Sequence, residues 1–439
     1  MKSYCDILVV GGGVAGLAAT AALASTGREV ICIDRAPAEA GMADTRTTAF
    51  LRPAVDLLYE AGAWFNLKPE AAALNVMRLI DAGGRENAAR EIADFTADEI
   101  GEPPFGWNVT NAAVRRALMA RISELPGAEL RTETALEGLI ARRAEAFARL
   151  SDGATIVAKL VIAADGRTSA ARDMARIGAR RWDYGQKALV FTVAHEFSHF
   201  GVSTEVHRSG GPFTLVPMPD GEGGHRSSVV WMEKAGEADR LADLPVAEFE
   251  AELNERALGV LGPLKLVSGR AAWPIISMLA DRLTERRVAL VAEAAHVVPP
   301  IGAQGLNMSL GDISALKAAI GDDPGAEEGL ALYQRRWPEL AARVAGIDAL
   351  NRAALSETQS LRDIRRIALA AIARTPPVKR TAMRLGLAAR FLRETSMPVG
   401  AIAHRVGYTS VSSFSRSFTE HMGKTPTHFR KGFTLSAAA

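Results

Sequence analysis

Three glycines near the N-terminus, Gly11, Gly13 and Gly16, have the G-x-G-x-x-G spacing of a phosphate-binding turn. The first glycine permits a tight turn, the second lets the backbone approach a pyrophosphate, and the third lets a helix pack closely on a strand. Unpaired N–H groups at the start of that helix, together with its dipole, favour negatively charged phosphates. Asp34 follows Gly16 by 18 residues, where a ribose-binding carboxylate belongs.

The residues around these glycines have the pattern of the elements that must position them. Ile7–Val10 is a short apolar run typical of a buried parallel strand, and "EVICIDR" predicts a second strand that ends at Asp34. The unit therefore predicts a dinucleotide site, although the motif alone does not separate FAD from NAD. The expected contacts are Gly11, Gly13, Val14, Ala15, Gly16, Asp34 and Arg35.

Two later segments have chemistry suited to the rest of a flavin. "AKLVIAADGRTSAAR" predicts a strand that runs into Asp165-Gly166, and "RRVALVAEAAHVVPPIGAQGLNMSLGD" predicts a strand, a Gly/Pro-rich turn and a helix. An acid after a strand can accept hydrogen bonds from ribityl hydroxyls. A turn that opens a helix directs backbone N–H groups at the pyrimidine edge of the flavin, where reduced flavin carries negative charge.

Taken together, these segments resemble the flavoprotein aromatic hydroxylases of the p-hydroxybenzoate hydroxylase class, and within it the UbiH/UbiF-like hydroxylases of ubiquinone biosynthesis. The resemblance also includes "DTRTTAFLRPAVDLLYEAGAW", "NAAVRRAL", "GPFTLVPMP" and "SSVVW", and it covers roughly residues 5 to 384. It implies an α/β fold with a Rossmann-like FAD-binding domain, a β-sheet substrate domain and C-terminal helices.

The resemblance also implies the reaction, which is hydroxylation of a phenolic ring by O2 through a C4a-hydroperoxyflavin. The substrate it implies is a polyprenylated ubiquinone precursor. Further FAD contacts are implied at Arg46 and Arg115, at Asp165 and Gly166, and in the last segment at Glu293, Pro300, Gly302, Ala303, Gln304, Gly305, Leu306 and Asn307. No catalytic residue is assigned, and the sequence has no evident cluster of metal ligands or nucleophile–base pair.

The chain departs from the family pattern at one position. The family has Gly-Asp before "AAH", whereas this chain has Ala292-Glu293. Glutamate keeps the carboxylate but adds one methylene, so the backbone withdraws slightly or the ribityl contact passes through water. His296 invites assignment as a base, but we favour a structural role because no acid–base role follows from its position.

The reductant is left open between two kinds of donor. No second strand–GxGxxG–helix unit occurs in the sequence, so NAD(P)H has no Rossmann domain of its own. This agrees with single-component hydroxylases, in which NAD(P)H binds transiently across the cleft. A ferredoxin-type donor is the alternative.

Composition agrees with a globular enzyme of 439 residues, 48% hydrophobic and 23% charged. The two cysteines, Cys5 and Cys32, lie in or beside the first two strands and favour a reducing, cytoplasmic compartment. Ile7–Ala24 carries no charge, but its glycines favour a buried strand, turn and helix over a membrane span.

The three cofactor segments must converge, so the FAD-binding domain is expected to be discontinuous, with residues 1–75, 100–180 and 270–335. Residues 76–99 and 181–269 are expected to form the substrate-domain sheet, and 336–384 C-terminal helices. The basic amphipathic segment 362–384 either packs on the FAD domain or contacts anionic membrane, which would place the protein at the inner face of the membrane or in a biosynthetic complex.

Residues 385–439 resemble half of an AraC/XylS-type helix–turn–helix domain. We expect a first helix at Pro398–Arg405, a turn at Gly407-Tyr408, and a recognition helix at Val411–His421. Core spacing is shown by Ala401, Ile402, Val406, Phe414 and Phe418, and the expected DNA contacts are Val411, Ser412, Ser415 and Arg416.

That family uses two helix–turn–helix units, and we expect the first to be missing. Residues 385–439 carry seven Lys/Arg and two Glu, a charge of +5 that leaves −3 on the rest of a chain of net charge +2. Weak DNA binding is therefore expected from the tail. Two functions remain open: a flavin monooxygenase with a half regulatory domain, or a flavin-coupled DNA-binding transcription regulator.

Overall fold

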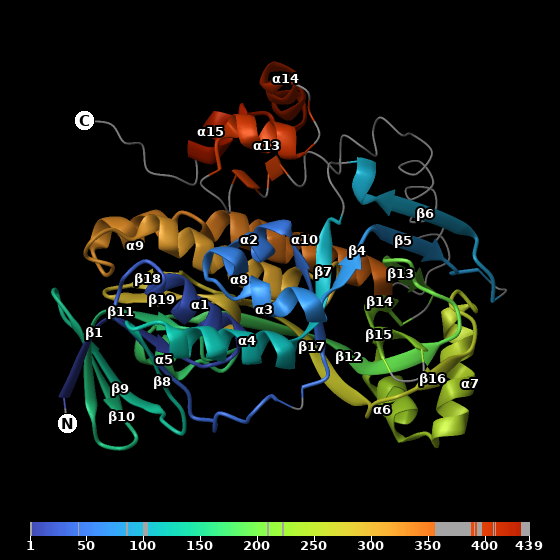
Figure 1. The fold of residues 1–439 in the computed structure, drawn as a ribbon, viewed down its shortest axis with the longest axis horizontal. Coiled ribbons are helices and arrows are strands. Elements are labelled where there is room, and N and C mark those ends of the chain that lie inside the picture. Colours follow the sequence, from blue (N-terminus) through green and yellow to red (C-terminus); the bar gives the residue numbers. More distant parts are fainter. Residues whose placement is uncertain are drawn as a thin grey trace.

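The structure of the chain is a computed structural model that describes residues 2–42, 44–84, 87–99, 104–208, 210–221, 224–355, 388–389, 391–392, 397–406, 408 and 410–431. Two large sheets lie at opposite ends of its main body, and helices pack between and over them (Figure 1). The predicted α/β class is confirmed. The basic segment 362–384 and the turn glycine Gly407 lie outside the described residues.

The first sheet has eight strands in the described part of the chain, six of them in the order β18-β19-β11-β1-β2-β8, while β10 pairs with β11 and β9. Strand β1 is central and parallel to both β2 and β11. Its residues Ile7, Leu8 and Val9 are fully buried, which is the pattern of a central strand in a parallel sheet. The strands are β1 (Lys2–Val10), β2 (Val30–Ile33), β8 (Ala128–Arg131), β9 (Leu136–Ala141), β10 (Ala146–Leu150), β11 (Thr155–Ala163), β18 (Thr284–Glu285) and β19 (Val288–Leu290).

The second sheet has nine strands among the described residues, eight in the order β20-β17-β12-β15-β14-β13-β5-β6, with β16 beside β12. It includes 271–280, although the sequence placed 270–335 in the FAD-binding domain. The strands are β5 (Val76–Asp81), β6 (Glu91–Thr96), β12 (Ala179–His195), β13 (Val202–His207), β14 (Pro212–Gly221), β15 (Gly224–Lys234), β16 (Leu264–Leu266), β17 (Ala271–Ala280) and β20 (His296–Val297).

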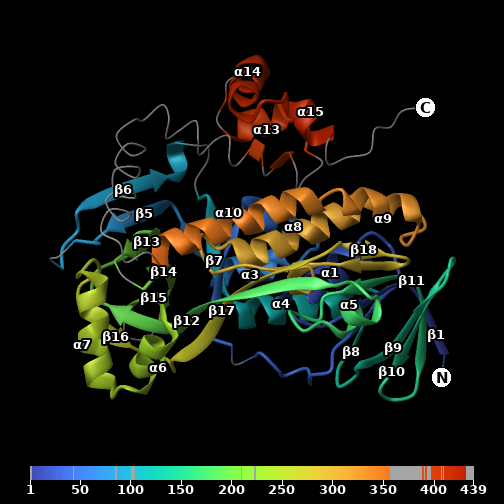
Figure 2. The same ribbon diagram turned by 180° about the vertical axis from the view of Figure 1, so that it is seen from behind.

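The long strands β12 and β17 reach from the second sheet toward the first (Figure 2). One face of the second sheet packs on α6 (Ala235–Asp243) and α7 (Val246–Ala257), and Phe191, Trp231 and Phe249 form the centre of this core. A small third sheet joins β3 (Thr47–Leu51), β7 (Gly106–Thr110) and β4 (Ala72–Leu74).

Helices connect and cover the sheets. Helix α10 is anchored to the second sheet because Asp348 accepts hydrogen bonds from Trp182 Nε1 at 2.9 Å and from Tyr184 Oη at 2.6 Å. The helices of the main body are α1 (Val14–Ala24), α2 (Arg52–Glu60), α3 (Trp64–Leu67), α4 (Asn111–Glu124), α5 (Ala170–Met174), α8 (Gln304–Ala319), α9 (Glu327–Gln334) and α10 (Trp337–Leu355), with short 3₁₀ turns η1 (Lys68–Glu70), η2 (Ala97–Glu99) and η3 (Ala292–Ala294).

The C-terminal helices α13 (Val399–Arg405), α14 (Val411–Met422) and α15 (Pro426–Lys431) form a separate layer beyond α9 and α10 (Figure 1). Their own core contains Ile402, Val406, Phe414 and Phe418, as expected from the sequence, whereas the expected core residue Ala401 is exposed. That expectation was wrong because the neighbouring Ala403 occupies the inward position of α13.

Candidate functional site

The glycine turn between β1 and α1 has the geometry that its sequence predicts. Gly11 has a φ of 106°, and a Cβ there would lie 2.5 Å from the carbonyl oxygen of Ala164. A Cβ on Gly16 would lie 1.8 Å from the carbonyl oxygen of Gly11, so these two glycines are required by the fold itself. Around Gly13 there is open space, which is available to a ligand rather than filled by protein.

Asp34 and Arg115 meet at this turn. The Gly12 N–H donates to Asp34 Oδ2 at 2.6 Å, so the carboxylate expected to bind a ribose also holds the turn. Arg115 donates through Nη1 to the Gly12 carbonyl, while its buried Nε and Nη2 have no hydrogen-bond partner among the described residues. A buried guanidinium with two free donors beside a phosphate-type turn fits a pyrophosphate. Val14 and Ala15 begin α1, and Arg35 is exposed.

The turn before α8 leaves that helix uncapped by any side chain. Gly302 and Ala303 have φ values of 59° and 54°, and the left-handed Ala303 is the N-cap residue. The unpaired N–H groups of the first turn therefore face the adjacent cavity and can receive an anionic or carbonyl oxygen. The cavity is lined here by Pro300, Gly302, Ala303, Gln304, Gly305 and Leu306.

Asn307 is fully buried, and its side chain ties α8 to β3. Its Nδ2 donates to the Ala49 carbonyl at 2.7 Å, and its Oδ1 accepts from the Leu51 N–H at 2.9 Å. The side chain thereby fixes the direction of the helix start.

Arg46 lines the same cavity but is already paired. It donates to Asp44 through Nε at 2.8 Å and Nη2 at 2.7 Å, and its guanidinium lies 4.5 Å from the Trp273 ring centroid. Burial raises the pKa of the Asp44 carboxyl, but the hydrogen bond and charge of Arg46 outweigh it and lower the pKa below its usual value. Arg46 therefore offers a ligand its stacked face and remaining N–H groups.

Asp165 turns toward helix α5 instead of the cavity. Its Oδ1 accepts from Ser169 Oγ, and its Oδ2 accepts from the Ala171 N–H at 3.0 Å. Gly166 has a φ of 87°, with open space where a Cβ would lie. Asp165 thus caps a helix, and any cofactor contact it makes uses the remaining lone pairs.

Glu293 forms a bidentate ion pair that the sequence analysis did not expect. Arg167 donates through Nε and Nη2 to its two carboxylate oxygens, each at 3.1 Å, and both residues line the cavity. Ala292, which precedes it, has a φ of 55°, a conformation in which glycine is favoured. The glycine that the family resemblance implies at this position would adopt this φ without strain, whereas here Ala292 holds it and Glu293 pairs with Arg167.

His296 is buried away from the cavity. Its Nε2 lies 2.6 Å from Asp312 Oδ2, and Asp312 also pairs with Arg336 at 3.3 Å. Asp312 Oδ2 further accepts from the Ala292 N–H at 3.0 Å, so this network holds the turn that carries Glu293. The geometry supports the structural role expected of His296.

One large cavity of about 990 Å³ connects these parts. Its walls are the start of α8, strand β3, the inward face of the second sheet and one side of α10. Residues of the wall that the sequence analysis did not single out include Trp273, Glu205, Arg343 and Leu350. Trp273 and Glu205 lie on strands and Arg343 and Leu350 on helix α10, and neither strand alternation nor helical spacing says which face meets a ligand.

In the C-terminal layer, Val411, Ser412 and Arg416 are exposed on α14 and Ser415 is half-buried, so the expected DNA-contacting face is not covered by the main body. Arg405 of α13 joins the layers, because its Nη2 lies 2.9 Å from Asp56 Oδ1 in α2. Among the described residues, no group of three or more His, Cys, Asp or Glu side chains could hold a metal ion. In that same part of the chain, no helix is both long and apolar enough to span a membrane.

Comparison with known proteins identifies the two parts of the chain. The sequence model of the FAD binding domain family matches residues 4–344, and that of the helix–turn–helix domain family matches residues 354–432. The second match begins before residue 385, where the sequence analysis began the tail, and it includes 356–384, part of the expected hydroxylase helices.

Two relatives and one solved structure cover most of the chain. Ubiquinone hydroxylase UbiL of Rhodospirillum rubrum is 36% identical over 389 residues, or 86% of this chain and 88% of the relative. The 3-demethoxyubiquinol 3-hydroxylase of Escherichia coli is 28% identical, covering 87% of this chain and 98% of that protein. PqsL, a probable FAD-dependent monooxygenase from Pseudomonas aeruginosa, has a TM-score of 0.67 at 22% identity over 81% of this chain and 98% of its own.

The match to the FAD binding domain family spans most of the chain, and the relatives align along nearly their whole length. The chain therefore belongs to the FAD-binding family that includes the ubiquinone hydroxylases, and it is an FAD-dependent aromatic monooxygenase with a helix–turn–helix domain at its C-terminal end.

Proposed function

We propose that the chain hydroxylates the phenolic ring of a polyprenylated ubiquinone precursor, using O2 and a C4a-hydroperoxyflavin. The observation that carries the proposal is the cavity of about 990 Å³, which is continuous from the start of α8 to the apolar face of the second sheet. Such a space has room for a flavin ring and a largely apolar ligand together. The names of the relatives supply the ubiquinone precursor as substrate class.

The same proposal assigns the residues that hold FAD. Its pyrophosphate would be bound by Arg115 and by the turn around Gly13. Asp34 would bind the ribose, and the first turn of α8 would bind the pyrimidine edge of the ring. FAD, when bound, supplies the electron transfer and oxygen activation. The chain's own residues would orient FAD and the phenolic substrate and exclude water from the cavity. The discontinuous FAD-binding domain and the substrate-domain sheet follow from this assignment.

NAD(P)H is the proposed reductant and a ferredoxin-type protein the alternative donor. We further propose that the protein contacts the inner face of a membrane or a biosynthetic complex, because a polyprenylated substrate resides in lipid.

The test is product analysis with the purified full chain. It should be yellow, release FAD on denaturation, and oxidise NAD(P)H faster when a phenol is present. With isotopically labelled O2, one labelled oxygen atom should enter the ring. A dehydrogenated product without labelled oxygen refutes the hydroxylase proposal. Lipid extracts of cells lacking the protein would then identify the substrate as the phenol that accumulates.

A second function is favoured by one specific observation, which is the exposed face of α14 within a matched helix–turn–helix domain. In this alternative, the chain is a flavin-coupled DNA-binding regulator. A footprint on a defined DNA sequence at nanomolar protein and physiological salt would favour it over the hydroxylase.

A further inference from the structure

The wall that the second sheet contributes to the cavity is apolar except at one place. Its apolar side chains include Ala188, Val190, Val230, Val216, Met77 and Phe95, and strands β17 and β20 add Trp273, Ile275 and Val297. The exceptions are Ser203 and Glu205 on β13 and Thr214 on β14. A carboxylate in an otherwise apolar wall is costly unless it has a partner, so Glu205 calls for a reason.

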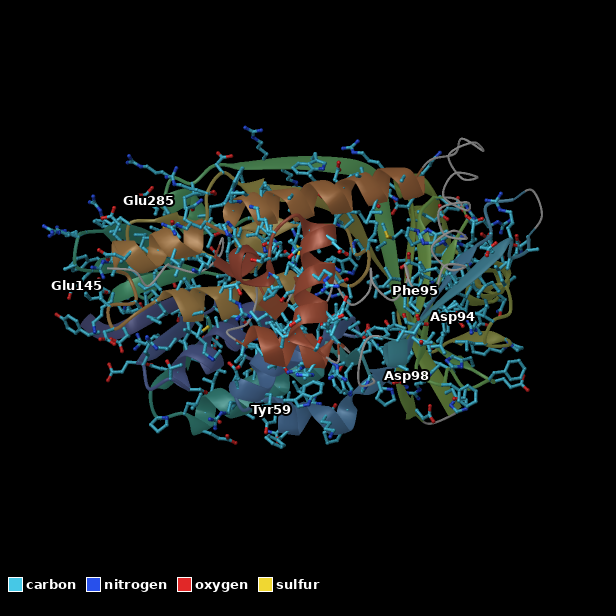
Figure 3. All side chains as sticks on the ribbon, turned by 90° about the horizontal axis from the view of Figure 1, so that it is seen from above. Tyr59, Asp94, Phe95, Asp98, Glu145 and Glu285 are labelled. Carbon is cyan, nitrogen blue, oxygen red and sulfur yellow. The ribbon has the colours of Figure 1, made fainter. Side chains whose placement is uncertain are left out.

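Strand geometry fixes Glu205 toward the cavity. Its neighbours Thr204 and Val206 are buried on the opposite face, and alternation along the strand places Ser203 and Glu205 together. In the antiparallel register, Glu205 lies directly opposite Thr214. The three polar side chains therefore form one patch, which we call the polar patch of β13 and β14. Phe95 marks this end of the molecule, opposite Glu145 and Glu285 (Figure 3).

Glu205 has one occupied and one free oxygen. Its Oε1 lies 2.6 Å from His207 Nε2, and the two side chains are 15% and 17% exposed. Its Oε2 makes no hydrogen bond within the described residues and is not among the buried atoms that lack a partner, and the Glu205 residue lines the cavity. The His207 pair leaves Oε2 available to a ligand and holds the carboxylate in place.

On the two strands beside this pair, charged side chains are either paired or absent. On β5, Asp81 lies opposite His207 and is paired with Arg90 at 2.6 Å. On β14, the residues opposite Glu205 and His207 are Thr214 and Pro212, which carry no charge. Glu205 is therefore the acidic group that this face of the sheet presents to the cavity.

We propose that Glu205 is a catalytic residue of this enzyme, which accepts a hydrogen bond from the phenolic hydroxyl of the substrate through Oε2, and that His207 positions it. This inference rests on the proposed hydroxylation of a phenol. The bound flavin would supply the electrophilic oxygen, and the O–O bond that joins this oxygen to the flavin would break as the ring carbon forms its new C–O bond. In the same step the phenolic O–H bond would break, its proton would pass to Oε2, and its electron pair would move toward the ring. The ring carbon would then lose its own proton to the oxygen left on the flavin, and Glu205 would return the first proton to the phenolic oxygen.

The inference also names a substrate class. A carboxylate at this end of the cavity attracts a hydrogen-bond donor and repels an anion. The ring should therefore carry a free hydroxyl at the polar patch and no carboxylate there. A neutral alkylated phenol fits this requirement, and a hydroxybenzoate does not.

The experiment is a comparison of three probes on two proteins. Binding of p-heptylphenol, p-heptylanisole and p-hydroxybenzoate is followed by the absorption change of bound FAD in the wild-type chain and in Glu205→Gln. The wild type should prefer the phenol over the anisole by about ten-fold or more, because the hydroxyl donates to a charged acceptor. In Glu205→Gln this preference should fall by about five-fold or more, while p-hydroxybenzoate binds more tightly than it does to the wild type.

Two further variants separate recognition from structure. Asp94→Asn is the matched control, because Asp94 pairs with Arg78 beside Phe95 but does not line the cavity. It should keep the phenol preference. His207→Gln keeps a polar N–H donor beside Glu205 and should keep most of the preference, whereas His207→Leu should lose it. If Glu205→Gln fails to retain FAD, the two His207 variants make the same test.

Equal phenol-to-anisole preference in wild type and Glu205→Gln would overturn the inference. Labelled-oxygen incorporation by the wild type reports on the proposed function separately. A wild type that hydroxylates, with a preference independent of Glu205, retains the function and refutes this role. If the phenol preference depends on Glu205 but the wild type forms no hydroxylated product, the phenol subsite at Glu205 is retained and the proposed hydroxylase function is refuted.

Discussion

Replacing Arg115 by methionine should weaken FAD binding without destabilising the apoprotein. Arg115 is 7% exposed, and one of its nitrogens donates to the Gly12 carbonyl. The other two, Nε and Nη2, are buried without a partner in the described part of the chain. In the apoprotein these donors are a cost, and with a pyrophosphate bound they become strong hydrogen bonds. The variant should therefore weaken the FAD-bound state while leaving the stability of the apoprotein nearly unchanged.

The magnitudes follow from the same contacts. A hydrogen bond that involves a charged group contributes about 1.5–3 kcal/mol, so the dissociation constant for FAD should rise about ten- to hundred-fold in Arg115→Met. For the apoprotein, loss of the bond to Gly12 is offset by removal of unsatisfied donors worth about 1–3 kcal/mol. The free energy of unfolding should therefore change by no more than about 1 kcal/mol.

The assays are FAD titration of the apoprotein and its unfolding in urea. Arg116→Met is the matched control, because Arg116 is the next residue of α4 and forms an exposed pair with Glu70 at 2.7 Å. The control should leave both quantities nearly unchanged. An Arg115→Met protein with normal FAD affinity and an apoprotein destabilised by several kcal/mol would refute the reasoning, since Arg115 would then be a structural residue.

Three other predictions concern stability and the tail. Ala292→Gly should relieve about 1–2 kcal/mol of left-handed backbone strain in the folded state. It should also give the unfolded chain more freedom, which costs about 0.5–1 kcal/mol of stability. The urea midpoint of unfolding should therefore stay the same or rise. Burial raises the pKa of the Asp56 carboxyl, and the charge of Arg405 only partly opposes this shift. The folded protein therefore holds this proton more tightly than the unfolded chain does. The resulting stability is present below about pH 4 and is lost as the pH rises through the raised pKa. Unfolding of Asp56→Asn from pH about 4 to 7 should lack this decline. Deleting 385–439 should leave FAD content and phenol-stimulated oxidation intact, and loss of either contradicts it.

The parts of the fold that the sequence could predict are those encoded by short-range patterns. The run Ile7–Val10, the glycines after it and the strand ending at Asp34 each carry a local physical signature, and the structure has β1, α1 and β2 there. The recognition helix was expected at Val411–His421, and α14 spans Val411–Met422 because Ser410 accepts from the Ser413 N–H and Gly423 ends the helix.

The side-chain partners could not be predicted in the same way. Glu293 and Arg167 are 126 residues apart, and their pairing depends on how β11 and β19 lie side by side. Glu205 is separated from α8 by about a hundred residues of sequence, and its cavity position depends on the register of β13 with β5 and β14. The pattern of the strand gives two equivalent faces, and only the packing of α6 and α7 on one of them leaves the other to the cavity.

The arrangement of the C-terminal helices allows the hydroxylase activity and DNA binding to be tested independently. The tail contacts the flavin part through α13, where Arg405 pairs with Asp56, so the expected DNA-contacting residues Val411, Ser412 and Arg416 on α14 stay exposed. Covering that face with DNA does not require the cavity to open, because its described walls belong to residues 46 to 350. Salt should therefore weaken DNA binding steeply, since phosphate contacts dominate, while phenol affinity changes little because the ligand is bound in a largely apolar space.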